Sequence, residues 1–384
     1  MDEKIIRIGN CSGFYGDKLS AAKEMVEGGP IDVLTGDYLA ELTMAILFSQ
    51  KMQRGEKAGY VGTFMKQLKE IANTCAEKNI KIVSNAGGLN PKSMAEDVEE
   101  MLKAMNLDLK VAYIDGDDLM PRLDELKSSG EKLNNIDTGQ EFFEQNMPPL
   151  SANAYLGCWA IKEALDKGAD IVICPRVTDA AVVMGPAAWK YNWNKNDFDK
   201  LAGALAAGHI IECGAQATGG NYSFFHEVPS FENIGYPIAE IKEDGSFYIT
   251  KHENTGGLVS TGTVTAQLLY EISSPDYLNP DVISHFDTLK IEEVGKDRVY
   301  ISGTKGSPPP STHKVCMNLS GGYKNGMELI VTGLDIPEKA KIFTDELFRS
   351  LGGKEQFDDV SIQLYRTDKK NPETNEEAMA ILKI

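Results

Sequence analysis

The sequence lacks the spacings that mark many common functional sites. Its 6 cysteines show no C-x-x-C spacing, and its 5 histidines show neither H-x-x-x-H nor H-E-x-x-H spacing. These absences disfavour a zinc ribbon, a redox pair, a disulfide framework and a histidine-rich metal centre. The motifs G-x-G-x-x-G, G-x-x-x-x-G-K-[ST] and G-x-S-x-G are also absent, which disfavours a nicotinamide cofactor, a P-loop nucleotide and an α/β-hydrolase triad.

Positive charge is scarce and long apolar runs are missing. The formal net charge of -18 would repel nucleic acid and anionic lipid, so we expect neither nucleic acid nor membrane as a partner. No stretch reaches the roughly 18 apolar residues that span a bilayer, and the start, MDEKIIRIGN, does not resemble a signal peptide. We therefore expect a cytoplasmic protein, and also a homo-oligomer.

A repeated pattern of apolar runs and helical segments predicts an α/β fold with a mainly parallel sheet flanked by helices. Four segments with helical spacing lie between the runs, the last of them SANAYLGCWAIKEALDKG, with Ser151 as its cap. The predicted strands are 4–9, 31–36, 81–87, 110–116, 170–175 and 209–213.

The pattern changes after residue 228, where short strand-like runs are separated by turns. We therefore predict an α/β domain over 1–228 and a smaller, strand-rich α+β second domain over 229–384. In the second domain we expect a helix near 336–350, and a helix over 255–271 that packs on the first domain.

The loops that follow the predicted strands are rich in small and polar residues. In a parallel sheet these loops meet at the carboxyl ends of the strands, so the sequence predicts one shared ligand crevice. Glycine N–H groups and helix N-termini there would favour a phosphate, a carboxylate or a CoA-like group. The candidate ligand-binding residues are Asn10, Ser12, Asn85, Gly87, Gly88, Arg176, Gln216, Thr218, Gly219, Gly220 and Asn221.

Three residues are candidates for proton transfer, and each has a simpler structural interpretation. Arg176 could clamp an anion beside Asp179, or the two could form an ordinary i, i+3 ion pair. Asp37 and Glu41 could share one helix face for proton transfer or cation binding, or Asp37 could simply cap the helix. His226 could act as an acid or base, or it could be a loop histidine bonded to backbone. The candidate catalytic residues are Asp179, Asp37 and His226, and no metal site is assigned.

Taken together, the loops resemble the acyclic terpene utilization AtuA-like family. The resemblance spans about residues 4–320 and departs from the family pattern at Cys174-Pro175 and at Glu253-Asn254. Its blocks are IRIGNCSGFYGD, GGPIDVLTGDYLAELTM, VSNAGGLNP, SANAYLG, RVTDAA, GHIIECGAQATGGNYS, TGGLVSTGTVTAQLLYEI and YLNPDV.

The resemblance implies a ligand that is an acyl-CoA or a branched, terpenoid-like carboxylic acid. Our first hypothesis is a hydratase-type lyase of catabolism that needs no cofactor, with glycine N–H donors at the carbonyl and Asp179 or Asp37 moving the proton. The alternative is a non-catalytic acyl-CoA-binding or scaffold subunit. Family members often continue into, or are encoded beside, a small ferredoxin-like α+β module. The resemblance therefore implies that either a separate small partner subunit of this kind completes the chain, or the sequence is a piece of a longer protein. A third hypothesis is an oxygen-ligand metal enzyme that uses Asp37, Glu41 and Asp179.

Overall fold

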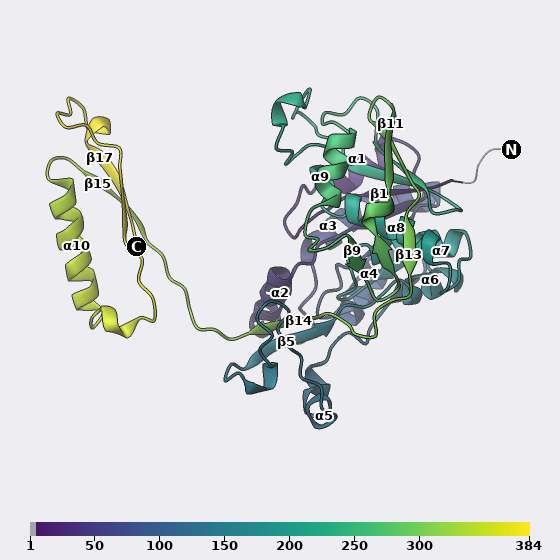
Figure 1. Ribbon diagram of the computed structural model, residues 1–384, viewed down its shortest axis with the longest axis horizontal. Coiled ribbons are helices and arrows are strands. Elements are labelled where there is room, and N and C mark those ends of the chain that lie inside the picture. The colour runs from purple at the N-terminus through teal and green to yellow at the C-terminus, as the bar shows by residue number, and fades with distance from the viewer. Residues whose placement is uncertain (1–4) are drawn as a thin grey trace. The chain divides into compact units, whose positions relative to one another are not determined.

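The computed structural model describes residues 5–384, which form two compact units. The larger unit ends at Ser320 and the smaller one is Gly321–Ile384 (Figure 1). The helices are α1 (Ala21–Gly28), α2 (Glu41–Arg54), α3 (Gly62–Lys78), α4 (Pro91–Ala104), α5 (Leu123–Ser128), α6 (Trp159–Asp166), α7 (Ala181–Lys190), α8 (Phe198–Ile211), α9 (Thr261–Leu268) and α10 (Ile336–Ser350).

A nine-stranded mixed sheet forms the centre of the larger unit, in the order β11-β12-β8-β7-β1-β2-β3-β6-β4. Strands β1, β2, β3, β6 and β4 run parallel, and β7, β8, β12 and β11 continue the sheet in antiparallel fashion. The strands of this sheet are β1 (Ile5–Asn10), β2 (Val33–Gly36), β3 (Lys81–Ser84), β4 (Val111–Tyr113), β6 (Ile171–Ile173), β7 (Pro237–Lys242), β8 (Phe247–Lys251), β11 (Lys290–Gly295) and β12 (Arg298–Ser302).

Helices cover both faces of the parallel strands, so these strands are apolar on both sides. Val33 and Val83 belong to the core under α6, α7 and α8, whereas their neighbours Leu34 and Ile82 belong to the core under α1, α3 and α4. Figure 1 shows α6, α7 and α8 gathered on one side of the larger unit. This arrangement confirms the predicted α/β class with an additional strand-rich part.

Two elements differ from the sequence prediction. Residues 209–213 were predicted to be a strand, but the segment up to Ile211 is the end of α8, which is buried along almost its whole length. A helix that is apolar on all sides shows the same unbroken apolar run as a buried strand. Ser151 does not cap a helix, because it lies in β5 (Pro149–Ala154), and α6 begins only at Trp159.

The boundary between the two units lies later than the boundary expected after residue 228. Strands β7, β8, β11 and β12 all follow that point, yet they extend the central sheet next to β1. Helix α9 contacts α8, and smaller sheets complete the larger unit. The strands of these smaller sheets are β5, β9 (Asp276–Leu278), β10 (Ile283–His285), β13 (Lys305–Ser307) and β14 (Val315–Leu319).

The smaller unit pairs one helix with a three-stranded antiparallel sheet of order β15-β17-β16. Ala380 and Leu382 of the central strand are buried, as are Ala340 and Phe348 of α10. The helix observed over 336–350 is the one that the sequence predicted. The strands are β15 (Glu328–Thr332), β16 (Gln363–Arg366) and β17 (Met379–Lys383).

Candidate functional site

Polar side chains gather where the parallel strands end. Asn10 ends β1, Asp37 follows β2, Asn85 follows β3, and Arg176 lies three residues past the end of β6. These strands run parallel and side by side, so their carboxyl ends share one edge of the sheet. All four side chains are buried, with at most 5% of each residue exposed. We call Asp37, Asn85, Arg176, Asp179 and Glu212 the Arg176 cluster.

Arg176 is the fixed cation of this cluster, with only 1% of the residue exposed. Its Nε donates to the Val177 carbonyl at 2.9 Å, its Nη1 donates to the Leu39 carbonyl at 2.9 Å, and its Nη2 donates to Asp179. Burial alone would lower the pKa of the guanidinium, but the neighbouring Asp179 raises it overall. Arg176 therefore holds Asp179 in place and joins the loop after β6 to the loop after β2. The side chain of Asp179 remains 24% exposed.

Asp37 is a buried carboxyl next to that cation. The Nδ2 of Asn85 donates to its Oδ1 at 2.5 Å, and the Leu39 N–H donates to the same oxygen at 3.2 Å. Burial is the largest cause that raises the pKa of Asp37 well above its ordinary value, and the nearby Asp179 adds to the effect. Arg176 and the Asn85 bond act in the opposite direction without reversing it. The surroundings of Asp37 thus favour its protonated form over the carboxylate.

Glu212 is a functional candidate that the sequence prediction missed. It follows the last residue of α8, is 5% exposed, and has one oxygen, Oε1, 3.1 Å from Nδ1 of His209. Burial raises its pKa well above the ordinary value, as do Asp179 and Glu271. Within residues 5–384 its Oε2 has no hydrogen-bond partner. The sequence signal that could have identified Glu212 is its i, i+3 spacing from His209. This spacing places the two side chains on the same face only if the segment is a helix.

Tyr155 connects the Arg176 cluster to the surface. Its hydroxyl donates to Glu41 at 2.5 Å, and Lys314 Nζ lies 3.1 Å from the same Glu41 oxygen. Burial raises the pKa of Glu41, but the Tyr155 bond and the Lys314 ammonium outweigh it and lower the pKa to about 2. Glu41 therefore pairs with Lys314 in this structure. Among the described residues no group of three or more His, Cys, Asp or Glu side chains is placed to hold a metal ion, so Asp37, Glu41 and Asp179 do not assemble as the metal hypothesis requires.

The predicted glycines have structural uses for their N–H groups. Gly87 donates to the Cys174 carbonyl at 3.0 Å and Gly88 donates to the Asn85 carbonyl at 3.2 Å. Gly219 and Gly220 donate in the same way to backbone carbonyls of the turn before them, at 3.1 and 2.8 Å. The N–H groups that were expected to bind a ligand therefore donate to backbone carbonyls of the chain itself in this structure.

Two further predicted residues, Asn10 and Ser12, support the backbone around the cluster. Asn10 Nδ2 donates to the carbonyls of Ile211 and Glu212, at 2.5 and 3.0 Å, and so covers the end of α8. The Ser12 carbonyl accepts the N–H of Asp37 at 3.0 Å. Both residues therefore position the carboxyl groups of the cluster.

The rest of the predicted set lies along the chain after α8. Thr218 is buried and its hydroxyl donates to the Ala215 carbonyl at 3.0 Å, whereas Gln216 is half-buried and Asn221 is exposed. His226 is exposed in a short 3-10 turn, η4 (Phe225–Glu227), where its ring contacts Phe224 and Phe225. Within the described part of the chain, no contact joins His226 to the Arg176 cluster.

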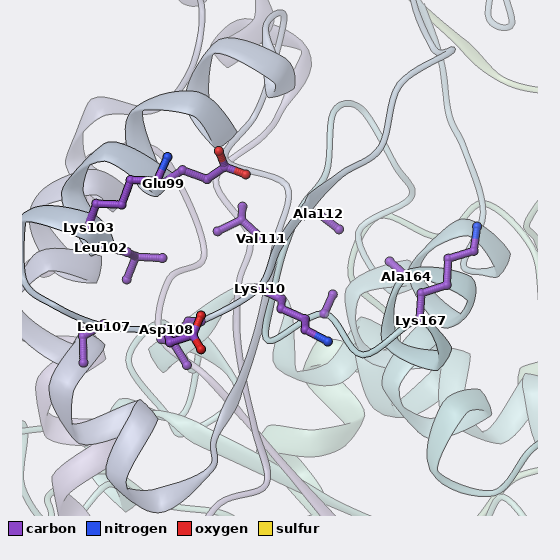
Figure 2. A pocket seen from close by; sticks show the side chains of 12 residues that line it. Glu99, Leu102, Lys103, Leu107, Asp108, Lys110, Val111, Ala112, Ala164 and Lys167 are labelled. Atoms are coloured by element: carbon purple, nitrogen blue, oxygen red, sulfur yellow. The ribbon is translucent and has the colours of Figure 1, made fainter.

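Two hollows in the surface lie away from this cluster. One, of about 600 Å³, is lined by the end of α4, the stretch into β4 and the end of α6, as Figure 2 shows with Lys103, Lys110 and Lys167. A second, of about 460 Å³, lies beside Trp159 and Trp193. The first hollow sits at the start of β4, the opposite end of the strands from the cluster, where ligands of open α/β sheets are not usually bound. We therefore assign the candidate site to the buried Arg176 cluster.

The fold and site define an α/β protein with a carboxyl-rich centre at the carboxyl ends of parallel strands. Residues 6–384 match the model of a family described as acyclic terpene utilisation family protein AtuA. The chain belongs to that family. No curated protein and no solved structure matches the chain. None of the described helices is both long and apolar enough to cross a membrane.

Proposed function

We propose that this chain is an enzyme of acyclic terpene utilisation that acts on an acyl-CoA or a branched carboxylic acid, as a hydratase-type lyase without a redox cofactor. The observation that carries the proposal is the pairing of Asp37, a buried carboxyl with a raised pKa, with Asp179, a partly exposed carboxyl held by Arg176. Hydration of a double bond conjugated to a carbonyl needs one group that gives a proton and another that takes one.

The roles follow from accessibility and charge. Asp179 is the exposed member, so it takes a proton from water while the water oxygen forms a bond to the β carbon of the substrate. The electrons of the carbon–carbon double bond move toward the carbonyl, and the α carbon then receives the proton of Asp37. One water is consumed, Asp179 ends protonated and Asp37 ends ionised. Returning the proton from Asp179 to Asp37 resets the site, and the reverse sequence is a dehydration.

Substitution of Asp179 by Asn tests this function. The amide keeps the shape and can still accept a bond from Arg176, but it cannot take a proton from water. We expect kcat for a branched α,β-unsaturated acyl-CoA, or for the matching free acid, to fall by about 10² to 10⁴-fold with an unchanged circular dichroism spectrum. The matched control is Asp166→Asn, which removes an exposed carboxylate paired with Lys162.

Turnover and acyl-CoA binding by the wild-type chain distinguish an enzyme from a binding or scaffold subunit. Turnover that Asp179→Asn leaves unchanged would overturn the assigned role of Asp179. Calorimetric binding of these acyl-CoAs without any turnover would instead favour the binding or scaffold function. In that case the ferredoxin-like partner proposed from the family resemblance should be added before the assay is repeated.

A further inference from the structure

Glu212 is the one buried carboxyl of the Arg176 cluster to which the proposed reaction gives no role. It caps the C-terminus of α8, where the helix dipole is negative and disfavours an anion. One of its oxygens lies 3.1 Å from His209 Nδ1, and the other has no hydrogen-bond partner within residues 5–384. A buried carboxyl oxygen without a hydrogen-bond partner destabilises the folded state, so it calls for an explanation such as a functional role or a transient partner.

His209 is fixed behind Glu212. The two residues are one helical turn apart on α8, and neither is more than 5% exposed. The His209 ring lies 4.9 Å from the Tyr277 ring and 5.6 Å from the Phe286 ring, between centroids, and this packing sets its orientation. Burial is the largest cause that lowers the pKa of His209 from its ordinary value, and this favours the neutral imidazole. A neutral imidazole can donate or accept at Nδ1 and can thus orient the carboxyl in either protonation state.

The four charged groups around Glu212 come from three parts of the chain. Asp179 and Arg176 lie before α7, Asp37 lies after β2, and Glu271 lies after α9. Three of these four are acidic, so a proton on Glu212 relieves electrostatic repulsion with them. The remaining titratable neighbours that interact with it are Cys213, Tyr270 and Tyr277.

We propose that Glu212 is the proton reservoir of this site, and that His209 is its positioning residue. The inference rests on the proposed function, because it supplies the step that resets the cycle. After each hydration Glu212 takes the proton from Asp179 and gives its own proton to Asp37, so that all three carboxyls return to their starting states. No other donor or acceptor is consumed. The orphan oxygen is the one free to exchange the proton.

Infrared spectroscopy tests the proton on Glu212 without any substrate. A protonated carboxyl gives a carbonyl stretching band that shifts in D₂O, and wild-type protein at neutral pH should show such bands from the cluster. Glu212→Gln should remove part of this intensity and Glu212→Asp should restore it. Glu163→Gln, which alters an exposed carboxylate paired with Lys167, is the matched control and should leave the bands unchanged.

Turnover then tests the reservoir role. We expect Glu212→Gln to lower kcat for the unsaturated acyl-CoA about a hundredfold with little change in KM, because it slows the reset and not binding. His209→Gln should shift the pH profile of kcat while the Glu212 band persists. Band intensity identical in wild type and Glu212→Gln would overturn the proposal, as would band loss with unchanged kcat. Absence of any turnover by wild type would count against the proposed function, while the band would still decide whether Glu212 holds the proton.

Discussion

The guanidinium carbon of Arg176 lies 4.4 Å from the centroid of the Tyr155 ring, a distance typical of cation–π stacking. Lys314 Nζ lies 4.8 Å from the same centroid. Tyr155 directly follows β5, and Lys314 directly precedes β14, the strand that pairs with β5. The ring that stacks on the buried Arg176 therefore lies next to a pair of strands that are far apart in the sequence.

Arg176→Lys should destabilise the protein although it preserves the charge. A lysine ammonium cannot make the three directed bonds to Val177, Leu39 and Asp179, and it stacks less well on Tyr155. Leaving buried acceptors unpaired costs about 1–3 kcal/mol each, so we expect the free energy of unfolding to fall by about 2–4 kcal/mol. Urea denaturation measures the change.

An exposed arginine provides the comparison for that variant. Arg122 forms an i, i+3 pair with Glu125 on the surface, so Arg122→Lys should leave the free energy of unfolding almost unchanged. Equal effects of the two substitutions would show that the directed bonds of Arg176 contribute nothing.

Glu41→Gln should weaken the protein at neutral pH but not in acid. The folded state lowers the pKa of Glu41 from 4.5 to about 2, so its contribution is present above pH 4.5 and is lost as the pH falls toward 2. Its side chain is 55% exposed, and solvent screening reduces the effect to about 1 kcal/mol at pH 7. Thermal unfolding of both proteins between pH 2 and 7 measures it.

The surface pair of α10 is the control for Glu41. Asp345 pairs with Lys341 on an exposed helix face, and Asp345→Asn should have almost no effect at pH 7. A loss of stability in Glu41→Gln that stays constant from pH 7 to pH 2 would show that packing, and not charge, accounts for it.

The stability that Asp117 contributes should depend on pH in the opposite direction to that of Glu41, and Asp117→Asn should remove this dependence. Asp117 is buried, and burial raises its pKa from 3.8 to about 6, although Asn153 and the Arg176 N–H both donate to it. The native state therefore keeps a proton that the unfolded chain releases, and stability falls as the pH rises from about 4 to 6. A shift of about 2 units corresponds to about 3 kcal/mol over that window.

The variant removes this titration while its amide oxygen can still accept from Asn153. The free energy of unfolding of the wild type relative to Asp117→Asn should therefore fall between pH 4 and pH 6 and be level above it. Denaturant melts at several pH values decide the matter. A difference that does not vary with pH in this window would mean that Asp117 titrates normally.

The positions of Asn10, Asp37, Asn85 and Arg176 could be predicted because they depend on a local pattern. Each follows a short apolar run, and the ends of parallel strands meet at one edge whatever the order of the strands. The order itself, with β6 between β3 and β4, could not be predicted, because periodicity carries no information about neighbours.

Other features depended on distant residues. Glu212 joins the site only because the segment before it is a helix, and the apolar run of α8 fits a strand equally well. The strand over 149–154 forms because β14, about 160 residues later, pairs with it. The glycine loops have the composition of a ligand cradle, but whether an N–H is free depends on carbonyls such as that of Cys174, which only the folded chain brings near.

Gly88 shows how the folded chain, and not the composition of the loop, determines the role of a glycine. We expect Gly88→Ala to destabilise the fold whether or not a ligand is bound. Its φ of 53° is in the left-handed region, and a Cβ there would lie 2.3 Å from Leu47 Cδ1 and 2.9 Å from the Gly59 carbonyl oxygen. Gly130 also has a positive φ, 90°, but a Cβ there would meet nothing within 4 Å. Both alanine variants carry the cost of the left-handed backbone, so their difference isolates the contacts of the added Cβ with Leu47 and Gly59. We expect Gly88→Ala to lose about 1–3 kcal/mol more than Gly130→Ala in urea melts. Equal losses would mean that both Leu47 and the Gly59 carbonyl move aside freely.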